Sequence, residues 1–258
     1  MDLYKTDEEI ELMKQSNQLV TRLLAELAKL VQPGITTKML DRIAEDYIRS
    51  HGGIPGFLGY NGYPATLCTS INSQVVHGIP ADVELKEGDI ISVDCGVVLQ
   101  GYYGDCAFTF AVGQISDEVK KLLRVTRECL FIGAEKAIVG NRLGDLSFAI
   151  QNHAETNGFS VVREMVGHGI GKNLHEKPEV PNYGRKGTGI KLMENMTICI
   201  EPMINTGTKN IVQEKDGWTV RTTDRKPSAH FELPVAVKEG SPLFLSSFKE
   251  IDDSLNKK

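Results

Sequence analysis

The sequence is poor in cysteine and contains no CxxC pair. Its five cysteines are an odd number, and Cys95, Cys106 and Cys199 fall in apolar runs typical of strands. Paired cysteines are the usual sign of a zinc site or a disulfide framework, whereas single cysteines in apolar runs are more often small buried hydrophobes. We therefore expect neither kind of cross-link, and a reduced, cytoplasmic location.

Long apolar runs and an excess of positive charge are also missing. No stretch approaches the roughly 18 apolar residues that a membrane span needs. The opening MDLYKTDEEIELMK is acidic and amphipathic, unlike the basic start and apolar core of a secretory signal. The net charge of −5 argues against nucleic acid as the main partner. We expect a cytoplasmic protein with neither membrane nor nucleic-acid partners.

Helix signals occur twice in the same order. Thr6-Asp7-Glu8-Glu9 is a capping box that opens a helix ending before Pro33, and Ser116-Asp117-Glu118 opens a counterpart. A second helix lies between Gly34 and Gly52, and its counterpart lies between Gly140 and Gly158. Both glycine pairs have the same separation of 18 residues.

Strand signals repeat as well. The segments LKEGDIISVD (85–94) and LMENMTICIE (192–201) carry leucine, glutamate, isoleucine and a final acid at matched positions. Such internal repetition indicates two similar units packed about a pseudo-twofold axis. The fold class we expect is α+β, with one domain over residues 1–258 built from halves at about 5–113 and 114–240. The polar tail at 246–258 is expected to be disordered or loosely packed.

Acidic residues sit on the polar side of the predicted strands. Alternate side chains of a strand point to opposite faces, so each acid shares its face with small or polar residues while the other face is apolar. A pseudo-twofold axis would bring these acids together, and like charges that close raise one another's pKa or require cations. The four acids are Asp94, Asp105, Glu201 and Glu232.

Two histidines lie in the glycine-rich segment VGHGIGKNLHEKP (166–178). Three glycines in five residues indicate close approach of another group, and His168 is the expected imidazole partner of the acids. Hard oxygen ligands with one imidazole suit two divalent ions better than one tetrahedral zinc. Two such ions would activate water for hydrolysis of a carbonyl or phosphoryl centre, which leaves peptidase, amidase and phosphatase open.

Six segments resemble one known family. They are VVHGIP, ISVDCG, GYYGDCAFTF, VGHGIGKNLHEKP, ICIEPM and DGWTV with SAHFE, and the resemblance covers the chain from about residue 5 to 240. Together they resemble the type I methionine aminopeptidases of peptidase family M24, which have the pita-bread fold. The resemblance implies a hydrolase with two divalent metal ions, whether cobalt, manganese, iron or zinc.

The resemblance also implies roles for the metal-binding and catalytic residues. Asp94 would bind the first ion, Asp105 and Glu232 would bridge both, and His168 and Glu201 would complete the second. Glu201 would in addition move the proton of the attacking water.

Two further histidines receive catalytic roles from the resemblance. His175 would hydrogen-bond the substrate carbonyl oxygen, and His77 would contact the nitrogen beyond the scissile bond.

The resemblance places an apolar pocket for the methionine side chain beside the metals. Its lining would be Tyr60, Tyr63, Cys68, Leu174 and Trp218, with Phe57 nearby. Several bacterial relatives carry cysteine where this chain has Phe57 and phenylalanine where it has Leu174, so the shape of the pocket stays open. Asn72 and Ser228 match positions that help hold a monovalent cation in some relatives. His230 shares a face with Glu232, but we do not include it in the site.

The expected function is removal of the initiator methionine from peptides and nascent chains whose second residue is small. The expected enzyme is a monomer that contacts the ribosome transiently. One alternative is an X-Pro aminopeptidase or prolidase, although those enzymes carry an added N-terminal domain and here the first helix begins near residue 6. The other alternative is a non-catalytic pita-bread module that binds peptides, although such modules typically lose metal ligands.

Overall fold

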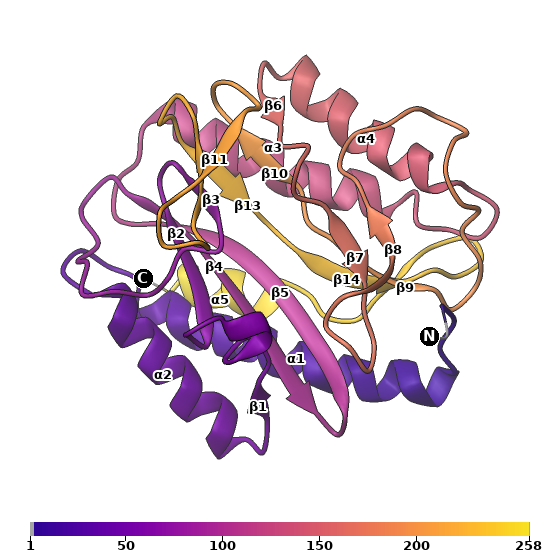
Figure 1. Ribbon diagram of the computed structural model, residues 1–258, viewed down its shortest axis with the longest axis horizontal. Coiled ribbons are helices and arrows are strands. Elements are labelled where there is room, and N and C mark those ends of the chain that lie inside the picture. The colour runs from indigo at the N-terminus through magenta and orange to yellow at the C-terminus, as the bar shows by residue number, and fades with distance from the viewer. Residues whose placement is uncertain (1–2, 258) are drawn as a thin grey trace.

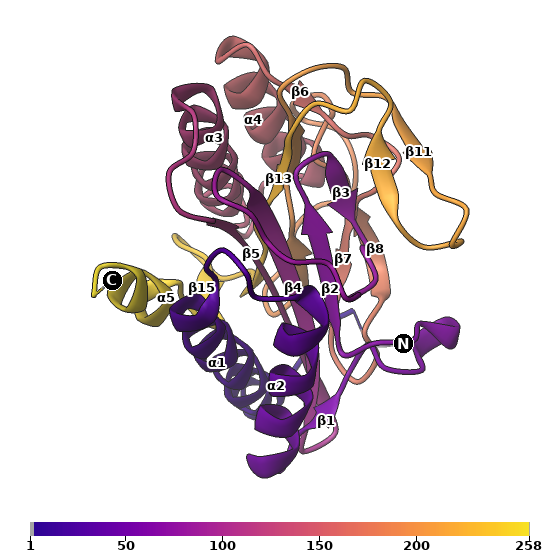
Figure 2. The same cartoon turned by 90° about the vertical axis from the view of Figure 1, so that its left-hand side faces the viewer.

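The computed structural model describes residues 3–257, which form helices on one side of several antiparallel sheets (Figures 1 and 2). The α-helices are α1 (Asp7–Leu30), α2 (Thr37–Ser50), α3 (Asp117–Ala134), α4 (Leu143–Thr156) and α5 (Lys249–Leu255), with a 3-10 turn η1 (Tyr60–Gly62). The strands of the first part are β1 (Ile54–Pro55), β2 (Leu67–Ile71), β3 (Gln74–Val76), β4 (Ile90–Leu99) and β5 (Tyr102–Ala111). The later strands are β6 (Ser160–Val161), β7 (Gly167–Gly169), β8 (Glu176–Val180), β9 (Thr197–Ile200), β10 (Met203–Asn205), β11 (Ile211–Gln213), β12 (Val220–Thr222), β13 (Ser228–His230), β14 (Leu233–Ala236) and β15 (Leu243–Phe244).

Helix α1 begins at the predicted capping box. The hydroxyl of Thr6 accepts a hydrogen bond from the Glu9 amide at 3.2 Å, and the Glu9 carboxylate accepts one from the Thr6 amide at 2.9 Å. The apolar stripe of the helix, which includes Leu19, Leu23 and Leu27, is buried against β4 and β5. Helix α1 therefore covers the apolar face of the first sheet, which consists of β1, β2, β4 and β5. The other face of this sheet is left free for the site.

Strands β4 and β5 form a long antiparallel hairpin. Its turn uses Gln100 and Gly101, whose φ angles of 52° and 82° match the positive φ values that a two-residue hairpin turn requires. The register pairs Cys95 with Cys106, and both thiols face the apolar core. Asp94 and Asp105 consequently lie on the opposite face, as strand alternation predicts.

The second sheet has the order β15-β14-β9-β7-β8, and α3 contacts it at β9. Helices α3 and α4 otherwise pack on the adjoining three-stranded sheet β13-β10-β6 (Figure 2). The two sheets meet where the Glu232 amide donates a hydrogen bond to the Ala107 carbonyl at 2.9 Å. This bridge, together with hydrogen bonds between Thr109 and the His230 backbone, brings the end of β13 and the start of β14 beside β5. It places Glu232 next to the acids of the first sheet.

The prediction of a loose tail at 246–258 was wrong over the described part of it. Residues 249–255 form helix α5, and Phe248 and Ile251 are 2% and 0% exposed. Phe248 packs edge-on to Phe108 and Phe231. Helix α5 is short and buries only one narrow stripe of side chains, so a segment with few apolar residues can still pack. Among residues 3–257 no helix combines the length and apolar character needed to cross a membrane.

Candidate active site

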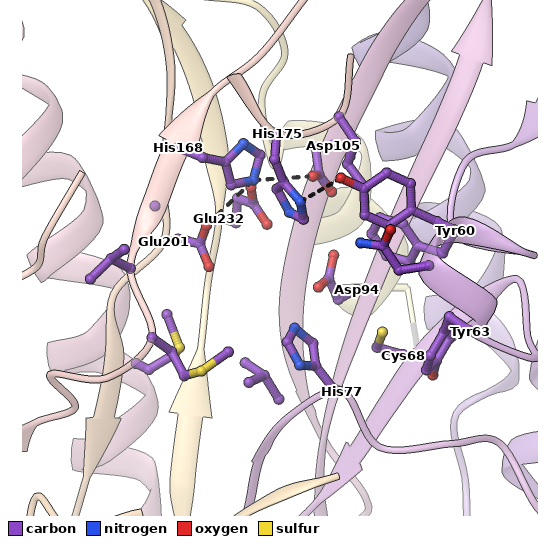
Figure 3. Close-up of a pocket in the computed structure, with 18 of the residues that line it drawn as sticks. Tyr60, Tyr63, Cys68, His77, Asp94, Asp105, His168, His175, Glu201 and Glu232 are labelled. Carbon is purple, nitrogen blue, oxygen red and sulfur yellow. Dashed lines mark hydrogen bonds and ion pairs between the residues drawn. The ribbon is translucent and has the colours of Figure 1, made fainter. Parts of the chain in front are cut away.

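A cavity of about 600 Å³ opens on the face of the sheets that the helices leave free (Figure 3). Its lining includes every residue that is predicted above to bind metal, take part in catalysis or form the methionine pocket. These are Tyr60, Tyr63, Cys68, His77, Asp94, Asp105, His168, Leu174, His175, Glu201, Trp218 and Glu232, together with Phe57. Residues more than 170 positions apart in the sequence thus share one cavity.

The acids converge because each comes from a different strand or strand end. Asp94 lies on β4, Asp105 on β5, Glu201 directly after β9, and Glu232 between β13 and β14. Together with His168 they make up what we call the charged end of the cavity. Figure 3 shows these side chains turned toward one another.

Burial raises the pKa of every acid at the charged end. The pKa of Asp94 rises to about 6, with burial as the largest cause. Burial first and then the neighbouring carboxylates raise the pKa values of Asp105, Glu201 and Glu232 well above their ordinary range. Crowded buried carboxylates of this kind need protons or cations to be stable.

The donor set fits divalent cations. Within residues 3–257, one buried oxygen of each of Asp94, Asp105 and Glu232 has no hydrogen-bond partner. Asp105, His168, Glu232 and the buried Cys199 each offer one potential ligand atom, and these four atoms all lie within 4.8 Å of one another. Carboxylate oxygens with one imidazole suit manganese, iron, cobalt and zinc alike.

His168 points its Nε2 atom at the acids. Its Nδ1 lies 2.9 Å from the Gly169 carbonyl oxygen, which fixes the proton on Nδ1 and leaves the Nε2 lone pair free. That Nε2 lies 3.7 Å from Asp105 Oδ2 and 3.6 Å from Glu201 Oε1. Burial, with His175 as a smaller cause, lowers the pKa of His168 to about 4.

The flanking glycines of His168 serve close strand packing. A Cβ atom at Gly167 would lie 2.3 Å from the Cys199 carbonyl oxygen, and one at Gly169 would lie 2.1 Å from the Lys177 carbonyl oxygen. Strand β7 therefore fits between β8 and β9 only without side chains at these positions. The glycines bring His168 to the site by letting its own strand enter the sheet.

His175 follows β7 in the same segment and packs its ring edge-on to His168, with centroids 4.4 Å apart. Its Nδ1 lies 2.9 Å from the Tyr60 hydroxyl. The segment is held by a buried ion pair of 2.8 Å between Lys5 and Glu176, and by the Tyr103 amide, which donates to the Gly171 carbonyl. His77 has a φ of 59°, and burial lowers its pKa to about 4.

The other side of the cavity, which we call the apolar end, consists of Phe57, Tyr63, Cys68, Leu174 and Trp218. Tyr63 and Trp218 meet edge-on at 5.0 Å, and the Tyr63 hydroxyl donates to the carbonyls of Leu67 and Gly78. Leu174 is 2% exposed. The apolar end is therefore well packed, and the hydroxyl of Tyr63 has hydrogen-bond partners within the chain.

Two residues expected to hold a monovalent cation lie together but outside the cavity lining. The Ser228 amide donates to the Asn72 carbonyl at 2.9 Å, and the Asn72 side chain bonds Asp89 and the Ile90 amide. Sequence reasoning missed His230, which is 1% exposed with Nε2 3.7 Å from Glu201 Oε2. The sequence signal that could have placed His230 near the acids is that it shares a strand face with Glu232.

Known proteins match both the sequence and the fold of this chain. A model of metallopeptidase family M24 matches residues 11–239, and the chain belongs to that family. Within the family its likeness is to the methionine aminopeptidases. A methionine aminopeptidase of Clostridium perfringens is 52% identical over 249 residues, which is 96% of this chain and 100% of that protein.

Solved structures agree. The crystal structure of a methionine aminopeptidase from Rickettsia prowazekii has a TM-score of 0.93 and 40% identity, over 95% of this chain and 99% of that one. An X-Pro aminopeptidase from Thermotoga maritima has a TM-score of 0.75 at 22% identity, over 95% of this chain but 62% of that one, which is a likeness of fold alone. The resemblance to type I methionine aminopeptidases and the pita-bread α+β fold are confirmed.

Proposed function

We propose that this metallo-aminopeptidase removes the initiator methionine from peptides and nascent chains whose second residue is small. The observation that carries the proposal is the cavity itself, in which unpartnered buried carboxylates lie beside a packed apolar wall. A charged end that needs cations and an apolar end that suits a thioether side chain are the two parts such a reaction requires.

The charged end would hold two divalent ions. Asp94 would bind one, His168 and Glu201 the other, and Asp105 and Glu232 both. Two ions held between shared carboxylates supply a nucleophilic water near neutral pH and stabilise the charge that develops on the carbonyl oxygen. The raised pKa values of the acids support this assignment, because bound cations would remove the repulsion among them.

Three residues of the chain would handle protons and orientation. Glu201 would take the proton of the attacking water and return it to the leaving amine. If the Tyr60 hydroxyl donates to His175 Nδ1, the proton of His175 sits on Nε2, from which it would donate to the substrate carbonyl oxygen. His77 would hydrogen-bond the nitrogen beyond the scissile bond.

The apolar end would select methionine. Tyr63, Cys68, Leu174 and Trp218, with Tyr60 at the rim, would surround an unbranched thioether and exclude water from it. A large second residue would be rejected because the segment that carries His168 and His175 stands directly over the acids.

The test is release of free methionine from Met-Ala-Ser by chelator-treated protein. We expect no release without metal and release on adding Mn²⁺ or Co²⁺. Met-Leu-Ser should be a much poorer substrate, and Ala-Pro should be untouched. Comparable kcat/KM for Met-Ala-Ser and Met-Leu-Ser would overturn the size rule. Cleavage of Ala-Pro alone would favour the prolidase alternative, and no cleavage with any metal would favour the binding module.

The setting of this activity is also part of the proposal. We propose a cytoplasmic monomer that meets nascent chains in transient contact with the ribosome. Five free, buried cysteines and the absence of a membrane-spanning helix among residues 3–257 support the location.

A further inference from the structure

His230 is a buried imidazole beside the charged end that the proposed reaction does not use. It closes strand β13 and is 1% exposed, yet it does not line the cavity. It lies two residues before Glu232, and its ring nitrogen lies near that carboxylate.

The side chain of His230 faces one oxygen of Glu201. His230 Nε2 lies 3.7 Å from Glu201 Oε2, while His168 Nε2 lies 3.6 Å from Glu201 Oε1. One carboxylate thus lies between two imidazoles, each beside a different oxygen. Among residues 3–257, His230 Nε2 has no hydrogen-bond partner. The charge of the Asp94 carboxylate also acts on the His230 ring. A carboxylate oxygen of Glu232 lies within 4.8 Å of a ring nitrogen of His230.

The backbone of His230 is fixed by the other sheet. Its amide donates to Thr109 Oγ1 at 3.0 Å, and that hydroxyl donates back to the His230 carbonyl at 2.7 Å. Since the Thr109 proton is used, Ser92 Oγ donates to Thr109 Oγ1 at 2.8 Å. These hydroxyls on β4 and β5 hold the His230 backbone in place, and thereby keep its imidazole beside Glu201.

We propose that His230 is a positioning residue for Glu201. Its Nε2 faces Oε2 of the carboxylate at 3.7 Å and would hydrogen-bond that oxygen once bound cations draw the acids together, so that Oε1 stays turned toward His168 and the metal side of the cavity. The proposal rests on the proposed function, because it concerns how Glu201 meets cation and water. Hydrogen bonds to ligating carboxylates from outside the metal's own ligand set typically change metal affinity or activity by about 10- to 100-fold.

Two isosteric variants test this assignment. In His230→Gln the side-chain amide reaches the place of Nε2, whereas in His230→Asn it reaches only that of Nδ1. Mn²⁺ binding to chelator-treated protein is measured by calorimetry, and kcat and KM are measured on Met-Ala-Ser. We expect His230→Asn to lose about 10- to 100-fold in affinity for one of the ions and to lower kcat more than KM. His230→Gln should keep most of both.

Other outcomes overturn the assignment. Wild-type behaviour of both variants would mean that His230 does not act on Glu201. Equal losses in both, with a lower melting temperature of the metal-free proteins, would mean a structural role only. Two imidazole nitrogens coupled to bound metal in pulsed electron paramagnetic resonance would make His230 a direct ligand instead. Failure of the wild-type protein to bind Mn²⁺ or release methionine would instead count against the proposed function.

Discussion

The charged end and the apolar end of the cavity meet where strands β2 and β4 pair. Cys68 of the apolar end pairs directly with Asp94 of the charged end across β2 and β4. Yet the apolar end is complete as it stands, with Leu174 buried and both hydrogen bonds of the Tyr63 hydroxyl made within the chain. The charged end keeps buried oxygens without partners and four carboxyls with raised pKa values.

This difference separates two ways of building a site. The apolar end gains free energy from packing, so it contributes to folding whether or not substrate is bound. The charged end destabilises the metal-free fold, because its carboxylates repel one another in a buried place. A substitution at the apolar end should therefore weaken substrate binding and lower stability together. A substitution of an acid at the charged end should weaken metal binding but raise the stability of the metal-free protein.

The largest effect is expected from Asp105→Asn. This change removes one charge from the crowded acids without altering their shape, and it replaces a proposed bridging ligand. Methionine release should fall about a thousandfold or more, since metal ions contribute several kcal/mol to such reactions. The melting temperature of the metal-free protein should rise, as differential scanning calorimetry would show.

Asp41→Asn is the matched control. Asp41 is a half-buried aspartate whose carboxylate accepts hydrogen bonds from the amides of Thr66 and Leu67, and it lies away from the cavity lining. Its replacement should leave Mn²⁺ affinity unchanged and should not raise the melting temperature. A metal-free Asp105→Asn protein that melts lower than wild type would contradict the contrast between the two ends.

The next effect is expected from Leu174→Ala at the apolar end. Truncation of a fully buried leucine costs about 2–5 kcal/mol of unfolding free energy. It should also lower kcat/KM for Met-Ala-Ser by about 10- to 200-fold, mainly through KM, because the proposed methionine pocket loses apolar contact. Steady-state kinetics and urea unfolding measure the two effects.

Leu24→Ala provides the comparison. Leu24 lies on α1 in the main core and is 0% exposed, so this variant should lose similar stability. Its kcat/KM should match that of wild type wherever both are folded. Equal kinetic losses in the two leucine variants would mean that Leu174 has no special role toward substrate.

A third effect concerns pH and sharpens the same contrast. Metal binding needs deprotonated carboxyls, and the pKa of Asp94 is raised to about 6 while those of the other three acids lie well above their usual range. Affinity for Mn²⁺ should therefore fall as pH drops through 6, by about tenfold per pH unit for each proton taken up. Calorimetric titration between pH 5 and 8 measures this slope.

Stability of the metal-free protein should change in the opposite direction over that range. Groups whose folded pKa is raised contribute stability that is fully present below the unfolded value and is lost as pH rises through the folded value. His77 and His168, with pKa values lowered to about 4, contribute stability above pH 6.5 that is lost as pH falls toward 4. A melting temperature of the metal-free protein that rises steadily from pH 5 to 8 would argue against dominance by the acids.

Much of the site was predictable because strand alternation is a local property. The side of β4 on which Asp94 lies follows from its immediate neighbours, and the same holds for Asp105 on β5. The bridge between Ala107 and Glu232, which joins the sheets, was not predictable, because pairing between distant segments leaves no local pattern. Close approach at Gly167 and Gly169 was predicted, but the groups that approach them were not, since only the assembled sheet shows those carbonyls.

His230 and the tail were misjudged for different physical reasons. His230 lies on the same face as Glu232, but a position on a face does not say whether a side chain reaches the cavity or stands behind it. The tail has few apolar residues, and composition alone suggests looseness. Phe248 and Ile251, spaced three apart, are nevertheless enough to anchor one short helix on an existing aromatic cluster.

The smallest effect is expected from Asp252→Asn on α5. Arg127 donates to Asp252 at 2.8 Å, but both side chains are 34% exposed, so solvent screens the pair. The variant should lose less than about 1 kcal/mol of unfolding free energy in urea. Ile251→Ala, which removes buried contacts of the same helix, should lose about 2–5 kcal/mol. Neither should change the kcat/KM of the folded protein, because α5 lies outside the cavity lining. A larger loss for Asp252→Asn than for Ile251→Ala would mean that charge, and not packing, holds this helix.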